Sequence, residues 1–358
     1  MLADAVRDPA ELCRLVGLPE LADEAAQAAS GFPILVPRPF LERIRPGDAA
    51  DPLLRQVLPR RAELVASECF TTDPLGEVAA GCSTGLLQKY RGRALLLTTG
   101  TCGVHCRFCF RRHYPFDSLN PIGSSGLGAT GSASAYLTPT LAEPVPPSPA
   151  LAPIPTLAEP VAPGDWDEAL GLIADDASIA EVILSGGDPL TLPDCQLAQL
   201  AERLAAIPHV RRLRLHTRMP VVVPQRVTAE LLDWLRATRL TPLVVIHVNH
   251  PAELDRVVAA ALGRLADAGV PLLSQGVLLR GVNDDADVLA ELYGRLADLR
   301  VMPYYLHQLD PVAGAADFEV PVARGRQLIA ALRARLPGYA VPRYVRETRG
   351  GASKEALA

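Results

Sequence analysis

Residues 95–112 read LLLTTGTCGVHCRFCFRR, in which an apolar, strand-like run leads directly into three cysteines. Cys102, Cys106 and Cys109 have C-x3-C-x2-C spacing. Cysteine thiolates hold iron–sulfur clusters, and a four-iron cluster usually takes four of them, so three would leave one iron open to a small molecule. The spacing therefore favours a four-iron cluster with an open coordination site.

A zinc site is the alternative for these cysteines, with His105 or His113 as the fourth ligand. Structural zinc sites usually pair two ligand clusters across a loop, and no second Cys/His pair follows in the sequence. The four remaining cysteines are scattered singly, so we expect buried thiols rather than disulfides, and a reducing, cytoplasmic location. These four are Cys13, Cys69, Cys82 and Cys195.

The composition describes a folded protein of mildly acidic charge. The 358 residues are 49% hydrophobic and 21% charged, with a net charge of −5. This balance argues against a large nucleic-acid-binding surface. No apolar stretch reaches the roughly 18 residues of a membrane span, and the first residues lack the pattern of a signal peptide. We therefore expect neither a membrane nor a nucleic acid among the partners.

Two parts of the chain differ in character from the rest. Residues 1–90 have short apolar periodicities and predict a helical region. Residues 119–164 are rich in Ser, Gly and Ala and then in Pro, and the segment LAEPV occurs in them twice. Because they lack a periodic apolar pattern, we predict a low-complexity, disordered insertion. The helices expected in the first part are Pro9–Val16, Leu21–Ala29 and Leu53–Ser67.

Residues 91–345, apart from the insertion, predict alternating strands and helices. Strand-like runs recur about every 30 residues, the size of one strand–helix unit. This alternation implies an α/β fold with a parallel sheet, and right-handed crossovers curl the sheet toward a barrel. Six units make a partial (βα)6 TIM-type barrel, followed by a tail at 346–358. The expected strands are Ala94–Thr98, Glu181–Leu184, Leu213–His216, Leu243–Val248, Pro271–Leu279 and Val301–Leu306, and the expected helices are Asp194–Ile207, Thr228–Thr238, Pro251–Ala268 and Asp284–Leu299.

Residues able to do chemistry follow the carboxyl ends of these strands, where the sites of such barrels lie. The run Ser185–Asp188 exposes backbone at two glycines, and an ordinary turn capped by Asp188 is the alternative. Arg111 follows the last cysteine by two residues, so covalent geometry alone places it near any cluster. We expect His250 to be a buried, hydrogen-bonded histidine. The other residues at strand ends are His216, Arg218, His247, Asn249, Arg280, His307 and Asp310.

The cysteine spacing resembles the signature of radical S-adenosylmethionine (SAM) enzymes, in which SAM chelates the open iron of a four-iron cluster. From Asp73 to Lys354, apart from the insertion, the chain resembles the lysine 2,3-aminomutase family, whose members also use pyridoxal phosphate (PLP). The resemblance implies a radical SAM partial barrel and an isomerase with three cofactors: the [4Fe-4S] cluster, SAM and PLP. It is carried by Asp73–Glu77, Leu95–Arg112, Leu184–Asp188, Thr217–Val222, Asn249–Pro251, Gly269–Asp284 and Arg300–Tyr305.

The resemblance implies a role for each residue that matches the family's pattern. Cys102, Cys106 and Cys109 would ligate the cluster. Lys354 would link covalently to PLP, and Arg111 would pair with the substrate carboxylate. The SAM contacts would come from Ser185, Gly186, Gly187 and Asp188, with Gln275 and His247 as further candidates; PLP would also be held by Lys89, Tyr90 and Arg93; and the substrate ε-ammonium would meet Asp310 and Glu347.

The implied reaction converts L-α-lysine to (R)-β-lysine by a PLP-assisted 1,2-amino shift, with an external electron donor for the cluster. Glu347 departs from the family, which has an aspartate at this position, so its reach is longer by one methylene. Only four residues follow Lys354, as in the short branch that supplies β-lysine for elongation factor P and its β-lysine ligase. The oligomeric state stays open.

Three alternatives belong to other functions. A different amino acid with a distal cation, such as ornithine or arginine, would suit the same two acids. A radical SAM enzyme that modifies RNA would need a basic face, which the charge balance opposes. A zinc-binding interaction protein would contain metal without inorganic sulfide.

Overall fold

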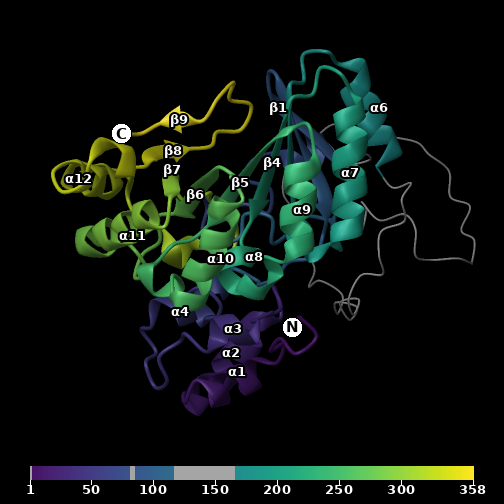
Figure 1. The fold of residues 1–358 in the computed structure, drawn as a ribbon. Helices are drawn as coiled ribbons and strands as arrows, with labels where there is room; N and C mark the ends of the chain where they lie inside the picture. Colours follow the sequence, from purple (N-terminus) through teal and green to yellow (C-terminus); the bar gives the residue numbers. More distant parts are fainter. Residues whose placement is uncertain (1, 81–84, 117–165) are drawn as a thin grey trace, which may run out of the picture.

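The computed structural model describes residues 2–80, 85–116 and 166–358 (Figure 1). Its centre is a nine-stranded sheet in which the strands pair in sequence order. Strands β2 to β8 run parallel, and β1 and β9 pair antiparallel at the two edges. The strands are β1 Leu86–Tyr90, β2 Arg93–Thr99, β3 Glu181–Gly186, β4 Arg212–Thr217, β5 Thr241–His247, β6 Leu272–Val277, β7 Val301–His307, β8 Arg343–Arg346 and β9 Glu355–Ala356.

The six predicted strands are confirmed as β2 to β7, in an open α/β sheet of the partial-barrel type. Parallel strands are covered on both faces, so they read as buried runs, and every residue of β3 is buried. The structure adds β8 as a seventh parallel strand and β9 as a short edge strand, and it places β1 inside residues 1–90, where the sequence predicted helices and loops. The three added strands are short and mixed in polarity, so they carry no clear period.

Helices connect the parallel strands and lie along the outer face of the sheet (Figure 1). In α7, the spacing of the buried residues Leu197, Leu200 and Leu204 forms one apolar stripe. The helix predicted from Pro251 begins only at Arg256, after a short 3-10 turn. The helices of this part are α6 Asp167–Asp175, α7 Asp194–Ala206, α8 Met219–Val222, α9 Ala229–Ala237, α10 Arg256–Asp267, α11 Ala286–Asp298 and α12 Val322–Arg333.

The N-terminal helices share the core of the barrel. Leu12 and Phe40 are fully buried in the same apolar cluster as Leu184 of β3. The single helix predicted over Leu53–Ser67 is wrong, because Pro59 has no N–H to donate and would clash with the preceding turn. The helices of this part are α1 Pro9–Leu15, α2 Ala22–Ala29, α3 Arg38–Leu41, α4 Pro52–Arg55 and α5 Glu77–Ala80, with a 3-10 turn at Arg61–Leu64.

Strand β1 and the segment that follows β8 meet through side chains at a place that we call the seam, formed by Lys89, Tyr90 and Glu347. Lys89 Nζ of β1 lies 2.8 Å from Glu347 Oε1, just past the end of β8. The Tyr90 hydroxyl donates to the same oxygen at 3.0 Å. Among the described residues no backbone ladder joins β1 to β9. Side chains rather than peptide hydrogen bonds therefore connect the two edges.

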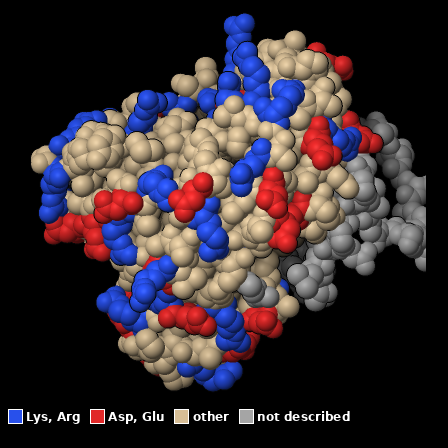
Figure 2. Space-filling model, in the orientation of Figure 1, with Lys and Arg blue, Asp and Glu red and all other residues tan. Residues whose placement is uncertain are grey.

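The scattered cysteines and the surface complete the description. Cys13 is buried as expected, but Cys69 and Cys195 are exposed, so the prediction of buried thiols is wrong for these two. Cys82 and the insertion predicted at 119–164 lie outside the described residues. Figure 2 shows positive and negative side chains interspersed over much of one face. None of the helices in the described parts of the chain is both long and apolar enough to cross a membrane.

Candidate active site

A cavity of about 360 Å³ lies at the carboxyl ends of the parallel strands. The chain order brings these ends to one edge of the sheet, where sites of such folds are found. Every cofactor-binding and substrate-binding residue predicted from the sequence lines this cavity. They are Lys89, Tyr90, Arg93, Cys102, Cys106, Cys109, Arg111, Ser185, Gly186, Gly187, Asp188, His247, Gln275, Asp310, Glu347 and Lys354.

The cysteine loop, residues 100–112, is held from outside by the N-terminal region. Arg107 is fully buried and forms an ion pair with Glu63 at 2.6 Å. Arg112 binds the same carboxylate at 2.8 Å. The Arg107 N–H donates to the Gln56 carbonyl at 2.9 Å, which ties the loop to the end of α4. Because a buried charge without its partner is costly, these pairs fix the path of the loop.

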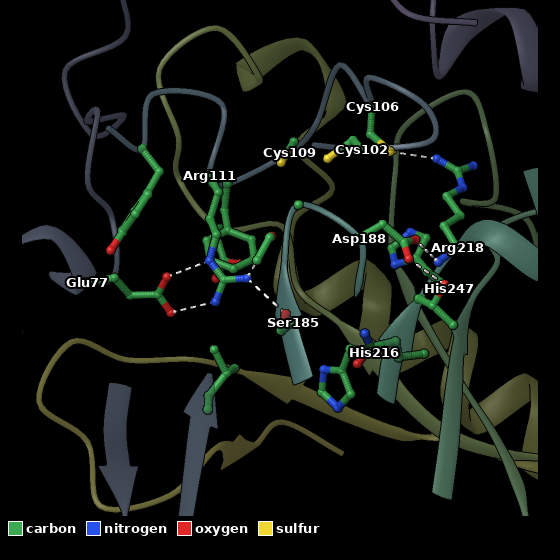
Figure 3. A pocket seen from close by; sticks show the side chains of 18 of the residues that line it. Glu77, Cys102, Cys106, Cys109, Arg111, Ser185, Asp188, His216, Arg218 and His247 are labelled. Carbon is green, nitrogen blue, oxygen red and sulfur yellow. Dashed lines mark hydrogen bonds and ion pairs between the residues drawn. The ribbon is translucent and has the colours of Figure 1, made fainter. Parts of the chain in front are cut away.

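Arg218, which follows β4, holds the same loop from the barrel side (Figure 3). Its Nη1 donates to Cys106 Sγ at 2.8 Å. Its Nη2 donates to Glu253 Oε2 at 2.9 Å and to Gln56 Oε1 at 2.6 Å. The guanidinium therefore fixes the position of the Cys106 sulfur and links it to the buried residues Glu253 and Gln56.

The three cysteines fit an iron–sulfur cluster. Cys102, Cys106 and Cys109 form no disulfide and line the same cavity. Burial first, and then the neighbouring cysteines, raise the pKa of the Cys102 thiol and raise that of Cys109 to about 11. Crowded, buried thiols of this kind become favourable as thiolates only when a positively charged group binds them.

The zinc alternative does not fit the geometry. His105 Nδ1 lies 3.0 Å from the Pro33 carbonyl, and His113 Nε2 lies 3.0 Å from the Ala313 carbonyl. Over residues 2–80, 85–116 and 166–358, no three His, Cys, Asp or Glu side chains converge on a single ion. A four-iron cluster takes one thiolate on each iron and needs no such convergence. The cysteine loop is therefore better suited to a cluster.

The turn after β3 is pressed against the start of the cysteine loop. Gly186 has φ +120°, and a Cβ there would lie 2.4 Å from the Thr99 carbonyl oxygen. A Cβ on Gly187 would lie 2.2 Å from the Thr101 carbonyl oxygen. Both contacts are too short for any side chain, so only glycine allows this approach. The turn and the loop consequently share one backbone arrangement.

Asp188 caps this turn, as the structural alternative had it. Its carboxylate accepts from Thr217 Oγ1 at 2.7 Å and from the backbone N–H groups of Arg218 at 2.6 Å, Leu190 at 3.0 Å and Met219 at 3.2 Å. Burial raises the pKa of Asp188 to about 6, although each of these hydrogen bonds opposes the shift. Four bonds use the whole acceptor capacity of a carboxylate, so the side chain has none left for a ligand.

Three histidines that face the cavity are neutral. Burial lowers the pKa of His247 and of His307 to about 3, with the nearby cations Arg218 and Lys354 acting in the same direction. Burial also lowers the pKa of His216 well below its usual value. Within the described chain, Nε2 of His216 and Nε2 of His247 are buried without a hydrogen-bond partner. Such orphaned atoms point to polar ligands in the cavity.

His250 lies outside this group. Its Nδ1 accepts from the Ala252 N–H at 3.1 Å and caps the 3-10 turn that follows β5. The histidine is hydrogen-bonded as predicted, but it is only half-buried. Its role is therefore a local cap.

Arg111 is buried beside Glu77, an acid at the start of α5. The Arg111 Nε donates to Glu77 Oε2 at 2.7 Å, and Nη2 donates to Oε1 at 3.2 Å. Its Nη1 donates to Ser185 Oγ at 3.2 Å (Figure 3). The arginine predicted to bind a substrate carboxylate thus already has one carboxylate partner inside the protein.

Glu347 is the centre of a second group of charges in the same cavity. It accepts from Lys89 Nζ, from the Tyr90 hydroxyl and, at the other oxygen, from Lys354 Nζ. Burial opposes ionisation, but Lys354 and Lys89 outweigh it and hold the pKa of Glu347 well below its usual value. Glu347 is therefore ionised, and its carboxylate pairs with the ammonium groups of Lys89 and Lys354.

Asp310 lines the same cavity, and no side chain in the described parts of the chain donates a hydrogen bond to its carboxylate. Burial, and then the charge of Glu347, raise the pKa of Asp310 to about 7. Such an acid gains its charge most readily when a cation comes close. The two acids at this end of the cavity thus differ. Glu347 forms ion pairs with two lysines, whereas no ion pair within the described residues includes Asp310.

The comparisons with known proteins agree with this arrangement. No protein-family model matches the chain. The chain is 40% identical to the L-lysine 2,3-aminomutase of Haemophilus influenzae, over 100% of this chain and 94% of that protein. It is 40% identical to the L-lysine 2,3-aminomutase of Escherichia coli, over 99% of this chain and 93% of that protein. The chain belongs to the L-lysine 2,3-aminomutase family. Aminomutases are isomerases, so the predicted enzyme class is confirmed.

A longer member of the aminomutase family aligns less completely. The chain is 34% identical to the L-lysine 2,3-aminomutase of Clostridium subterminale, over 96% of this chain but 73% of that protein. The alignment therefore covers more of the first two relatives than of this one.

The aminomutase site also contains residues that the sequence reasoning did not single out. Glu77 was quoted only as part of a shared segment, yet it is the partner of Arg111. Tyr305 lies with its ring centroid 5.7 Å from Lys354 Nζ, and Arg214 lines the cavity while paired with Glu181. An acid inside a shared segment is a signal that could have found Glu77. The tyrosine sits in a strand, where nothing sets it apart from packing residues.

Proposed function

We propose that this protein is a radical SAM, PLP-dependent L-lysine 2,3-aminomutase that converts L-α-lysine to (R)-β-lysine. The observation that carries the proposal is the pairing of Lys354 with Glu347 inside the cavity. A carboxylate that binds one primary ammonium suits another of the same chemistry, the ε-ammonium of lysine. Arg111 lines the same cavity and suits the α-carboxylate, so the charges complement both ends of the substrate.

The cysteine loop would hold a four-iron cluster through its three thiolates. With SAM bound and an external electron donor, the cluster would supply the radical chemistry that activates the β-carbon of the substrate. The turn at Ser185–Gly187 would offer its backbone to SAM, because glycine lets a ligand approach the main chain closely. Gln275 of β6 and His247 of β5 are register partners that line the cavity, and His247 has a free nitrogen for a ligand.

Lys354 would hold PLP, which supplies the carbonyl that carries the migrating amino group. Lys89 and Arg93 would provide cations for the PLP phosphate. Within the described residues Arg93 Nε is buried without a hydrogen-bond partner, a donor that a phosphate oxygen would satisfy. Tyr90 supports this end by stacking under the Arg93 guanidinium, whose centre lies 4.7 Å from the ring centroid.

Asp310 and Glu347 would receive the ε-ammonium of lysine. In this reading Lys354 leaves Glu347 when it serves PLP, and the substrate ammonium takes its place. A substrate without a distal cation would leave Asp310 buried without a cation, whereas Glu347 would keep its contact with Lys89.

Anaerobic turnover of single amino acids tests the proposal. We expect reconstituted protein with SAM, PLP and a reductant to convert L-lysine to (R)-β-lysine, and chiral chromatography to identify the product. Lys354→Ala should lose PLP absorbance and turnover but keep the iron–sulfur absorbance, because the covalent link is local. Faster conversion of ornithine or arginine than of lysine would refute the substrate assignment.

We further propose that the β-lysine serves the modification of elongation factor P in the cytoplasm. The support is the 40% identity to the Haemophilus and Escherichia relatives over 99–100% of this chain. The test is a coupled assay in which the product of this enzyme, elongation factor P and its β-lysine ligase are combined. Mass spectrometry should show a β-lysyl adduct that depends on all three, and an adduct that forms equally from α-lysine would argue against the link.

A further inference from the structure

Glu77 holds the Arg111 side chain in the cavity wall. Both side chains are buried, with exposed fractions of 8% for Arg111 and 5% for Glu77. Burying a charge is costly unless an opposite charge and hydrogen bonds compensate it. The two N–H···O contacts of 2.7 and 3.2 Å supply that compensation in a bidentate pair. Arg111 could not remain there as a cation without this acid.

The pair also fixes which edge of the guanidinium a ligand meets. Glu77 takes Nε and one hydrogen of Nη2. Ser185 Oγ lies 3.2 Å and the Gly186 carbonyl 3.4 Å from Nη1 (Figure 3). Among the described residues Nη1 thus already has two acceptors, which leaves the second hydrogen of Nη2 as the donor for a ligand. A planar, bidentate partner sets the plane of the guanidinium as well as its position.

Glu77 is itself held in place from two sides. Its N–H donates to Asp73 Oδ1 at 2.9 Å, and the next N–H, of Val78, donates to Oδ2 at 3.2 Å. On the other side Lys89 Nζ lies 3.9 Å from Glu77 Oε1. Glu77 thus separates two cations, Arg111 and Lys89, that would otherwise face each other across the cavity wall.

We propose that Glu77 is a positioning residue that orients Arg111 for the carboxylate of the substrate. The inference rests on the proposed function, in which Arg111 binds that carboxylate. Glutamine at position 77 would keep the shape of the side chain but lose one of its two acceptor oxygens. Its amide group would then point a donor at one of the two arginine donors. The guanidinium would then turn away, and the binding of a carboxylate would weaken selectively.

Equilibrium binding of two ligands to the reconstituted enzyme tests this inference. L-lysine carries the carboxylate, and cadaverine is the same molecule without it. For Glu77→Gln we expect the Kd of lysine to rise about tenfold, the worth of one charge-assisted hydrogen bond. The Kd of cadaverine should change less than about twofold, since it does not reach Arg111. Calorimetry under anaerobic conditions measures both without turnover.

Asp194→Asn is the matched control. Asp194 also holds an arginine with two contacts, to Arg226 at 2.8 and 2.9 Å, but neither residue lines the cavity. We expect it to leave the ratio of the two Kd values unchanged. If Glu77→Gln loses the iron–sulfur or PLP absorbance, Glu77→Asp is measured instead. It keeps the charge but is shorter, and we expect a lysine-selective loss of about threefold.

The outcomes separate the inference from the proposed function. A wild-type enzyme that binds and rearranges lysine, with equal shifts for both ligands in the Glu77 variants, would overturn the inference alone. No shift for either ligand would do the same. A wild-type enzyme that fails to bind lysine would overturn the proposed function and this inference together.

Discussion

The cysteine loop and the C-terminal tail, residues 346–358, reach the same cavity by opposite means. Buried ion pairs hold the loop. The Arg107 side chain is fully buried and that of Glu63 nearly so, so no ligand can come between them. The tail is anchored by the two-residue strand β9, and its lysine is held by one carboxylate. We therefore expect the loop to keep its position and Lys354 of the tail to change its ion-pair partner.

The difference follows from the chemistry proposed for each end. A cluster must keep its geometry through each electron transfer, so its ligands gain from a rigid support. The substrate must displace a lysine that is bound to a cofactor. Lys354 therefore needs a protein partner, Glu347, that can hold it and release it. Glu347 can do so because Lys89 and Tyr90 keep it compensated when Lys354 departs.

The strongest test of the rigid end is Cys106→Ala. We expect it to abolish the iron–sulfur absorbance and all cleavage of SAM, because two thiolates do not hold a four-iron cluster. Iron and sulfide analysis and chromatography of 5′-deoxyadenosine measure the loss. PLP absorbance at the tail should persist. Cys195→Ala, at an exposed cysteine, is the control and should behave as the wild type does; SAM cleavage by Cys106→Ala would refute the cluster.

Glu63→Gln tests the support of the loop. Removing one partner of a buried pair should lower the free energy of unfolding by about 3–5 kcal/mol. Arg107 and Arg112 would both lose their carboxylate, so the variant should also lose its cluster faster in a chelator. Glu291→Gln removes an exposed pair with Arg295 and should change stability by less than about 1 kcal/mol. Equal effects in denaturant titrations would mean that the loop needs no such support.

Asp310→Asn tests the exchangeable end through pH. Burial and Glu347 raise the pKa of Asp310 to about 7, so its negative charge is present above that pH and is lost as the pH falls through it. We expect the wild-type KM for lysine to rise about tenfold between about pH 8 and pH 6, following the ionised fraction. Asp310→Asn should have a high KM that no longer depends on pH in this range. An unchanged pH profile in the variant would exclude Asp310 from the ammonium site.

The smallest effect is expected from shortening Glu347. Glu347→Asp keeps the charge and should raise the KM for lysine by roughly twofold to fivefold, whereas Glu347→Gln should raise it by about tenfold or more. Steady-state kinetics with lysine give both values. Equal, mild changes would show that Glu347 is only a loop residue, and the preference for lysine would then rest on Asp310.

Much of the fold could be predicted from the sequence, because buried parallel strands are apolar runs and several helices, α1, α4, α9, α10 and α11, begin after a residue whose side chain caps them. The helix α9, for example, begins after Thr228, whose hydroxyl accepts from the Leu231 N–H. The strands β1 and β8 could not be predicted from the sequence, since they are short and their apolar residues follow no clear period. Pro59 was visible in the sequence and should have ended the helix predicted across it.

The site divides in the same way. The cysteines were found from local spacing, and Lys354 and Asp310 were found from resemblance. The charge network could not be found, because its partners are far apart in the chain. Arg111 and Glu77 are separated by 34 residues, and Lys89 and Glu347 by 258. Only folding brings these charges together, and no periodicity or motif records the pairing.

The seam between β1 and the end of β8 has a consequence for how the enzyme is assembled. A barrel closed by peptide hydrogen bonds must break a ladder to admit a large molecule, whereas at the seam the contacts that must part are between side chains, those of Glu347 with Lys89 and Tyr90 among them. Contacts between charged side chains weaken as salt screens them, and peptide ladders respond far less. Loading of the apo-protein with a bulky phosphorylated cofactor should therefore quicken with ionic strength, even where the folded state is equally stable.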